Sequence, residues 1–312
     1  MSPSAIHESP QLIEDNSFIV KSLTKCPCKV KTEPDKNGMC PPCSDPDLIM
    51  DIGQYILKKG ADIDKTNSVP ITNNDDMNIM AYLTNCKSER CVLESDLMRE
   101  VAPSSLVDES ISKLKSAGPA NTVEWLSNFN INDKLQELEG DFNEFGYMDT
   151  TMMDFASQGG SLDDPASIIS MIENGKQIIG CVINTDYYSS CGYGKQCGQH
   201  WVCVIIDTRK GKDTNWSIEY FDSVGDPPPK EIVKWQAKIQ KVLDAYRAKK
   251  GHTGGVNVVN SNVQHQHKNT ECGVYCLYYI RSRAEDISPY GFNQEPIADE
   301  KMINFRRYLF TD

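Results

Sequence analysis

The sequence predicts an α+β fold, in which a mixed central sheet is flanked by helices and preceded by a mainly helical N-terminal arm. Two apolar runs, HWVCVIID at 200–207 and WSIEYFDS at 216–223, are separated by a short polar turn, which is typical of paired strands. An amphipathic run at 227–250 indicates a long helix packed on that sheet. The first part of the chain instead alternates short apolar segments with stretches rich in Pro, Asn, Asp and Ser.

This change of composition predicts two domains. We expect an arm at 1–111 and a core at 112–312, because apolar and aromatic residues become denser beyond the boundary. Within the arm, LIMDIGQYILK at 48–58 and NIMAYL at 78–83 have the spacing of short helices.

The core contains further elements on either side of the strand pair. EWLSNFNINDKLQELEGDF at 124–142 has apolar residues near helical spacing, with Asn132 or Asp133 as a cap for its second half. Segments 161–175 and 271–286 predict two further helices, and segments 176–185 and 256–260 predict two further strands.

Charge and composition exclude several classes of function. The net charge of −12 repels bare phosphate, so nucleic acid is not expected as a partner. The sequence has no apolar run long enough to span a membrane and no secretory signal at its start, so we expect no membrane partner and an intracellular, reducing environment. The twelve cysteines are then expected as thiols, metal ligands or a nucleophile rather than as a disulfide framework.

One cysteine has the surroundings of a nucleophile. Cys272 stands where a polar loop, QHQHKNTE, gives way to an apolar helix. A helix N-terminus stabilises the thiolate, the reactive form of the side chain, through unpaired N–H groups and the helix dipole. Gly273 follows directly and leaves room for a substrate backbone beside the sulfur.

The partners that a nucleophilic cysteine needs come from the strand pair. His200 opens the first strand and Asp222 closes the second, so antiparallel pairing brings the imidazole and the carboxylate side by side. Gln266 lies six residues before Cys272, within reach as an oxyanion donor alongside the Cys272 N–H. Gln264, two positions earlier, is the alternative donor.

These residues, taken in order, resemble a known family. The order of motifs resembles that of the ubiquitin-like-protein protease and adenain clan of cysteine proteases. The motifs are HW, then an aromatic followed by FDS, then Gln and a Cys-Gly six residues later. Within the clan, the chain is most similar to the branch of large cytoplasmic DNA viruses such as African swine fever virus. The resemblance covers roughly residues 120–285 and implies that clan's fold. It implies that His200 is the general base, that Asp222 orients it, that Gln266 helps to form the oxyanion hole and that Cys272 attacks the carbonyl. The interval from His200 to Asp222 is longer than in cellular relatives, which suggests a longer turn.

The resemblance also implies a class of substrate. Trp201 matches a tryptophan that roofs a narrow channel suited to glycine, and Trp125 lies in a stretch that resembles a substrate-facing helix. We therefore expect a protein substrate, a polyprotein or a ubiquitin-like tail, cut after a Gly-Gly or Ala-Gly pair without a cofactor. In the viral branch this implies maturation of structural polyproteins at assembly sites in the host cytoplasm and in the virion.

Two other classes of function compete with a protease. Some bacterial effectors with this fold are acyltransferases, but they need basic clusters for their cofactors, and the acidic charge argues against them. A non-catalytic binding module is disfavoured because the complete set of His, Asp, Gln and Cys is present.

The arm holds two closely spaced cysteine pairs, CPC and CPPC. Four thiolates suit tetrahedral zinc, although C-x-C departs from the usual C-x2-C spacing. Free or bridged thiols and a redox pair are the alternatives left open. The candidate ligands for a structural zinc are Cys26, Cys28, Cys40 and Cys43. Two cysteines further along the arm, Cys86 and Cys91, either join that site or pair with each other.

Overall fold

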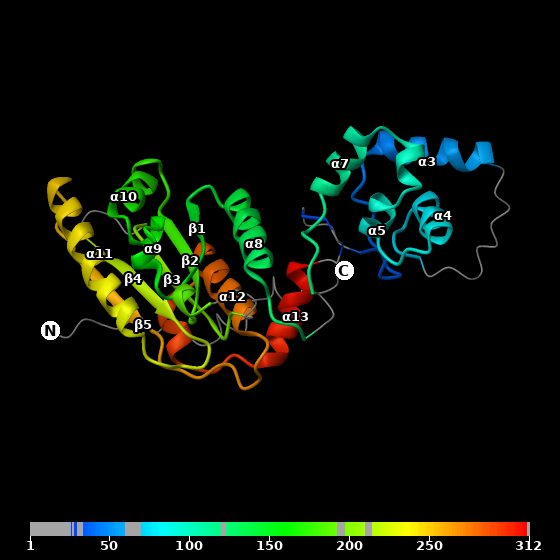
Figure 1. The fold of residues 1–312 in the computed structure, drawn as a ribbon. Coiled ribbons are helices and arrows are strands. Elements are labelled where there is room, and N and C mark those ends of the chain that lie inside the picture. Colours follow the sequence, from blue (N-terminus) through cyan, green and yellow to red (C-terminus); the bar gives the residue numbers. More distant parts are fainter. Residues whose placement is uncertain are drawn as a thin grey trace. The chain divides into compact units, whose positions relative to one another are not determined.

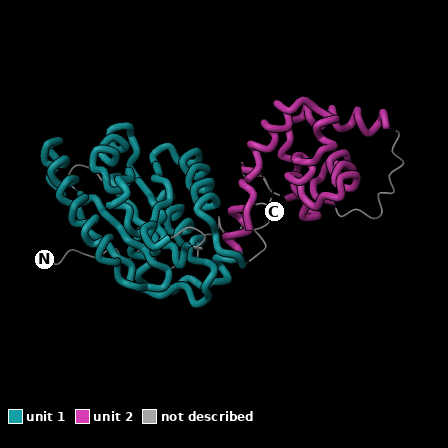
Figure 2. The backbone as a smooth tube through the Cα atoms, viewed as in Figure 1, with its two compact units in different colours: residues 1–15, 123–303 teal, residues 16–122, 304–312 magenta. Residues whose placement is uncertain are grey.

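The computed structural model describes most of the chain and divides it into two compact units (Figure 2). The described residues are 26, 28–29, 34–59, 70–119, 123–191, 197–209 and 214–310. Residues 123–303 belong to one unit, which we call the protease unit. The described residues before 123 and after 303 belong to the other, the arm unit, so 112–119 and 304–310 are grouped with the arm.

The arm unit is helical in its described part. The predicted helices at 48–58 and 78–83 lie within α3 and α4, and a small apolar core that includes Leu48, Met77 and Val92 forms where these helices pack. The helices of this unit are α3 (Pro46–Lys59), α4 (Asp75–Thr84), α5 (Glu89–Glu94), α6 (Met98–Val101) and α7 (Ser104–Ser112).

The arm cysteines are paired, which is one of the alternatives that the sequence left open, although no disulfide framework was expected for the chain as a whole. Cys26 bonds to Cys40 and Cys28 bonds to Cys43, with Cα atoms 5.0 and 5.4 Å apart, and a third disulfide joins Cys86 and Cys91. A fourth, Cys191–Cys197, lies in the protease unit. A sulfur in a disulfide has no thiolate to offer a metal. The zinc site at Cys26, Cys28, Cys40 and Cys43 therefore stays a prediction for the reduced chain.

The protease unit is built on a five-stranded mixed sheet, in which neighbours in sequence are neighbours in space. β1–β2 and β4–β5 are parallel, whereas β2–β3 and β3–β4 are antiparallel. The predicted pairing of the two apolar runs is confirmed as β3 and β4, and the other predicted strands are confirmed as β2 and β5. The strands are β1 (Phe145–Met152), β2 (Ile178–Asn184), β3 (Trp201–Asp207), β4 (Trp216–Phe221) and β5 (Val256–Asn260).

Helices cover both faces of this sheet (Figure 1). Alternate residues of β2, β3 and β4, such as Ile179, Val204 and Ile218, face a core shared with α10 (Pro165–Glu173) and α11 (Lys230–Lys249). The opposite face is covered by α12 (Cys272–Ala284), and α8 (Asn128–Asp141) packs against β1. The smaller elements are α9 (Phe155–Gln158), η2 (Ser161–Asp163), η3 (Tyr188–Ser190) and η4 (Pro289–Asn293). A further helix, α13 (Asp299–Leu309), crosses the boundary at 303, so its second half is grouped with the arm unit.

The start of α8 corrects the sequence prediction. Ser127 caps the helix, and Asn130 bonds back to the Ser127 N–H in a reciprocal capping box. Trp125 therefore precedes the helix instead of lying in it. Asn132 is not a cap either, because its side chain accepts the Thr150 N–H at 2.9 Å and so ties α8 to β1. Within the described residues, none of the helices has the length and apolar character needed to cross a membrane.

Candidate active site

Cys272 is the first residue of α12, as the sequence predicted. The helix then runs against the sheet to Ala284, so Cys272 belongs to the first turn, whose N–H groups have no partner within the helix. The residue is 4% exposed, which leaves its sulfur only a narrow access to solvent. The helix start therefore offers N–H groups to the sulfur, and burial shields the sulfur from bulk water.

His200 and Asp222 lie side by side, as the antiparallel pairing of β3 and β4 predicts. Cys203 on β3 lies opposite Phe221 on β4, so the residue before β3 and the residue after β4 are neighbours. His200 Nε2 lies 2.7 Å from Asp222 Oδ1. A charge-assisted contact of this length fixes the plane of the imidazole. Its other nitrogen, Nδ1, is the one left for the thiol.

Asp222 is itself held in place from several directions. It is 3% exposed, and its Oδ1 also accepts the Val224 N–H at 3.0 Å. The Tyr220 hydroxyl donates to Oδ2 at 3.3 Å, and the Asp222 N–H donates to Ser261 Oγ at 2.9 Å. Burial and the nearby carboxylate raise the pKa of Tyr220, so that hydroxyl remains a donor at every physiological pH.

The electrostatics favour a protonated imidazole. Burial lowers the pKa of His200, but hydrogen bonds to Asp222 and to Cys272 outweigh it and raise the pKa from 6.5 to about 10. At neutral pH the His200 ring therefore carries a positive charge between a carboxylate and a sulfur. This arrangement suits a residue that receives the proton of a thiol and later gives it to a leaving group.

Gln266 is held by contacts of its own, and its role as an oxyanion donor stays a prediction. The Ser223 hydroxyl donates to Gln266 Oε1 at 2.7 Å, and one Gln266 amide hydrogen is donated to the Lys268 carbonyl at 2.6 Å. The second amide hydrogen remains for an oxyanion. The alternative donor, Gln264, has its amide turned to the Gln266 carbonyl at 3.2 Å.

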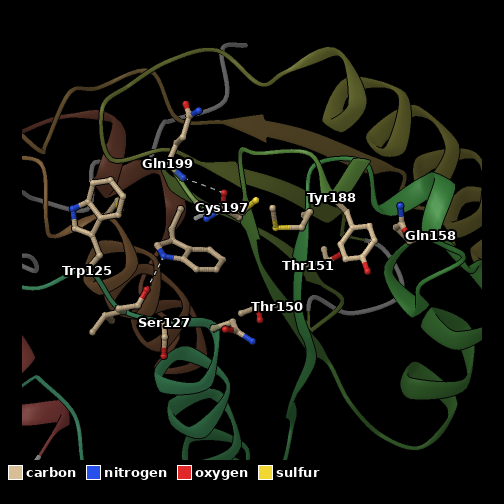
Figure 3. A pocket seen from close by; sticks show the side chains of 15 residues that line it. Trp125, Ser127, Thr150, Thr151, Gln158, Tyr188, Cys197 and Gln199 are labelled. Atoms are coloured by element: carbon tan, nitrogen blue, oxygen red, sulfur yellow. Dashed lines mark hydrogen bonds between the residues drawn. The ribbon is translucent and has the colours of Figure 1, made fainter. Parts of the chain in front are cut away.

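A cavity of about 810 Å³ opens beside Cys272, and its lining includes Leu126, Trp201 and, at one end, Trp125 (Figure 3). The Trp201 indole N–H donates to the Leu126 carbonyl at 3.0 Å, which fixes the ring over the cavity. Gly273 does not line the cavity. A methyl group placed on it would lie 3.2 Å from Leu126 Cβ and 3.3 Å from Trp201 Cδ1, so this glycine lets both side chains close on the cleft.

Comparison with known proteins agrees with this geometry. Residues 177–312 match the model of the Ulp1 protease family, C-terminal catalytic domain. Over 240 residues, the chain is 35% identical to a cysteine protease of African swine fever virus (Malawi tick isolate), an alignment that covers 72% of this chain and 83% of that protein. The chain belongs to the Ulp1 protease family. It is a cysteine protease of that family, as the sequence resemblance implied.

Two further relatives support the family assignment and the fold. A SUMO-1 cysteine protease from a Kenyan pig isolate of the same virus is 34% identical over 241 residues, covering 72% of this chain and 83% of that protein. A crystal structure of the African swine fever virus protease superposes with a TM-score of 0.66 at 26% identity, covering 86% of this chain and 91% of the other. The expected fold, a mixed sheet flanked by helices with a helical N-terminal region, is thereby confirmed.

The Ulp1-family site also contains residues that the sequence analysis did not single out. Leu126 forms part of the cleft wall, and its carbonyl accepts the Trp201 indole N–H. Ser223 contacts Gln266, and its place directly after Asp222 in FDS was the available signal. Thr150, at the end of a strand that was not predicted, lines the far part of the cleft.

Proposed function

We propose that this protein is a cysteine endopeptidase that cuts proteins after a pair of small residues of the Gly-Gly or Ala-Gly type. The observation that carries the proposal is the 2.7 Å contact between His200 and Asp222 beside a cysteine at the start of α12. This arrangement has the nucleophile, the base and the orienting carboxylate that acyl transfer through a thioester needs.

Each residue has a defined role in the proposed reaction. In this reaction His200 already holds the proton of Cys272, and the sulfur attacks the carbonyl carbon to form a tetrahedral intermediate. The Cys272 N–H and the Gln266 amide donate to its oxyanion. The C–N bond then breaks, and the leaving amine takes the proton from His200. Water, deprotonated by His200, attacks the thioester, and the acid product and the Cys272 thiol are released.

The preference for small residues is supported by the close walls beside Cys272. Leu126 and Trp201 lie near enough that even a methyl group on Gly273 would crowd both. A substrate chain that passes between these walls has little room for side chains next to the bond that is cut. Glycine and alanine are the residues that fit.

The biological substrate is proposed from the relatives. Similarity to proteases of African swine fever virus favours maturation of viral structural polyproteins at a site of particle assembly. The second candidate is the processing of ubiquitin-like modifiers, which is favoured by the name of one relative, a SUMO-1 cysteine protease at 34% identity. In both candidate functions, the substrate has small residues just before the bond that is cut, and the chemistry of the cut is the same.

The experiment is a cleavage assay of the full chain with Gly-Gly-Xaa and Ala-Gly-Xaa peptides, with Cys272→Ala as the control. We expect cleavage after the second small residue that vanishes in the variant, and labelling of Cys272 by a Gly-Gly-aldehyde peptide. Cleavage of a SUMO precursor without cleavage of free peptides would favour the second candidate. A folded protein that neither cleaves nor is labelled contradicts both.

A further inference from the structure

The loop that carries Gln266 is fixed at its start by the chain that follows β4. We call residues 265–268 the Gln266 loop. The Ser223 carbonyl accepts the N–H groups of His265 and Gln266, each at 2.8 Å. These two contacts hold the main chain where it enters the loop. The course of the chain after Gln266 is set by other contacts, which come from α13.

The far side of the Gln266 loop is fixed by one carboxylate. Asp299 Oδ2 accepts the N–H groups of His267 and Lys268 at 3.1 and 3.0 Å. Asp299 is 5% exposed and belongs to the first turn of α13. Hydrogen bonds from main-chain N–H groups to a carboxylate are among the stronger ones in proteins. Two of them from successive residues to one oxygen fix the direction of the main chain between those residues.

Both contacts of Asp299 bear on the side chain of Gln266. The His267 N–H belongs to the same planar peptide group as the Gln266 carbonyl, so fixing one fixes the other. The Lys268 carbonyl accepts one Gln266 amide hydrogen at 2.6 Å, while the Ser223 hydroxyl donates to Oε1 at the other end of that amide. The position of Lys268, which Asp299 holds, therefore helps to decide where the Gln266 amide points.

The same carboxylate ties the loop to the helix that begins with Cys272. The Tyr275 hydroxyl, three residues further along α12, lies 3.0 Å from Asp299 Oδ1 and 2.7 Å from the Ile297 carbonyl oxygen. Tyr275 is fully buried, and burial together with the Asp299 carboxylate raises its pKa, so the hydroxyl keeps its proton. Asp299 therefore contacts both the Gln266 loop and the start of α12.

We propose that Asp299 is a positioning residue for the cleavage reaction, because it holds the Gln266 loop against α12 and so directs the Gln266 amide to the oxyanion. This inference rests on the proposed function, in which that amide and the Cys272 N–H donate to the oxyanion. Asp299 does not touch the substrate in this role. It acts through the main chain of His267 and Lys268, so its loss should weaken stabilisation of the oxyanion and leave the thiol unchanged.

The main variant is Asp299→Ala in the full chain, because alanine offers no acceptor to the two N–H groups. We expect kcat for a Gly-Gly-Xaa peptide to fall about tenfold with little change in KM, and inhibition by a Gly-Gly-aldehyde peptide to weaken about as much. In both reactions the sulfur adds to a carbonyl carbon, and its oxygen becomes the oxyanion. Alkylation of Cys272 by iodoacetamide forms no oxyanion, so its rate should stay within about twofold.

Asp299→Asn tests whether the acceptor or the charge is needed. The asparagine oxygen can still accept both N–H groups, and its amide can donate to the Tyr275 hydroxyl, which keeps the Ile297 carbonyl as its own acceptor. We therefore expect this variant to recover kcat to within about threefold of the original protein.

The matched control is Glu300→Ala. It removes the neighbouring carboxylate from the same first turn of α13, and so makes the same change of charge and of side-chain length class. Glu300 is exposed and contacts the side chain of Lys268 at 3.1 Å, not its main chain. The control should leave kcat and inhibition by the aldehyde unchanged.

A double variant decides whether Asp299 acts through Gln266. When Gln266 is already alanine, Asp299→Ala should lower kcat by no more than about a further twofold. Tyr275→Phe is a milder variant that removes only a hydroxyl beside Asp299, and it should lower kcat about threefold with the same pattern of readouts. It keeps the test decisive if Asp299→Ala does not fold, which alkylation of the buried Cys181 and Cys276 would reveal.

Each outcome decides the inference. A kcat of Asp299→Ala within about twofold of the original contradicts it, as does alkylation of Cys272 that slows as much as cleavage. A double variant whose fall in kcat is the product of the single falls, or an equal fall in Glu300→Ala, also contradicts it. These outcomes leave the proposed function intact. If the original protein neither cleaves the peptide nor binds the aldehyde, the proposed function fails and this inference fails with it.

Discussion

Ser223 holds the side chain of Gln266 through a 2.7 Å hydrogen bond from its hydroxyl to Gln266 Oε1. The Ser223 carbonyl also accepts the N–H groups of His265 and Gln266, each at 2.8 Å. Ser223 is fully buried and directly follows Asp222. The strand end that orients the His200 imidazole therefore also orients the amide expected to face the oxyanion.

This relationship predicts that Ser223 acts through Gln266. The Ser223 hydroxyl engages Oε1, which leaves Nε2 as the donating end. Without that hydroxyl the amide keeps only its bond to the Lys268 carbonyl and is less firmly oriented. We expect Ser223→Ala to lower kcat about tenfold with little change in KM, and Gln266→Ala to lower it about a hundredfold. Steady-state kinetics of the double variant are the decisive measurement, since it should lose no more than Gln266→Ala alone. If the fall in kcat of the double variant equals the product of the two single falls, the two residues act separately.

The raised pKa of His200 predicts the alkaline limit of activity. The imidazole remains protonated until the pH approaches about 10, compared with 6.5 for a free histidine. Its contribution to stability is accordingly complete below pH 6.5 and is lost as the pH rises through about 10. Asp222→Asn removes the carboxylate that raises this pKa, so the alkaline limb of kcat/KM should move to lower pH and the maximum rate should fall.

The measurement is a pH–rate profile of both proteins over about pH 5 to 11. Val224→Ala is a useful comparison, because Val224 bonds Asp222 only through its main chain and should keep the limb of the original protein. An alkaline limb that stays in place in Asp222→Asn would mean that His200 is not the titrating group.

The positions of the candidate catalytic residues were predictable because strong local patterns place them. The apolar runs of β3 and β4 have the length and composition of strands, and antiparallel pairing then places His200 beside Asp222 without further information. Cys272 was predictable for a similar reason, since a helix N-terminus can be read from the change from polar loop to apolar helix. What these residues do was inferred from chemistry and resemblance.

The cleft walls were harder to predict because long-range contacts decide them. Trp125 lies outside α8, since the Ser127–Asn130 capping box sets the start of that helix more strongly than apolar spacing does. β1 was missed because FGYMDTTM shows neither a continuous apolar run nor clean alternation, and its pairing with β2 joins segments that are distant in sequence. The disulfide pairing of the arm likewise depends on which cysteines the fold brings together.

The far end of α12 is anchored by a buried ion cluster whose loss we expect to be costly. Arg283 lies 2.8 Å from Glu219 on β4 and 2.6 Å from Asp207 at the end of β3, and the side chains of all three are at most 3% exposed. Arg283→Met leaves Glu219 buried without its cation, and Asp207 keeps only Arg209. We expect a loss of about 3–5 kcal/mol in the free energy of unfolding.

Denaturant unfolding followed by tryptophan fluorescence measures this loss. All four tryptophans lie in the protease unit, so the signal reports the unit that contains the cluster. Arg281→Met on the same helix is the control, because its contacts with Glu285 and Asp141 are more exposed and should contribute about 1 kcal/mol or less. Equal losses in the two variants would contradict the role of the cluster.

The cysteine pairing predicts a defined alkylation pattern. Four cysteines are unpaired among the described residues, namely Cys181, Cys203, Cys272 and Cys276, and the other eight form disulfides. Denatured protein that has not been reduced should therefore take up four alkyl groups, and reduced protein should take up twelve, by intact mass. Zinc analysis of the reduced, folded protein then tests the arm site. Twelve alkyl groups without reduction, together with one bound zinc, would favour metal over disulfides.

Gly273 is expected to tolerate no side chain, because of the walls of the cleft. An added Cβ would lie 3.2–3.3 Å from Leu126 and Trp201, so Gly273→Ala forces both residues outward. We expect a loss of about 1–3 kcal/mol in stability and at least a tenfold fall in kcat/KM. Gly140→Ala is the matched control, since Gly140 lies in α8 with nothing within 4 Å of an added Cβ. It should stabilise the protein by up to about 1 kcal/mol and leave the kinetics unchanged. Full activity of Gly273→Ala would show that Leu126 and Trp201 do not set the width of the passage.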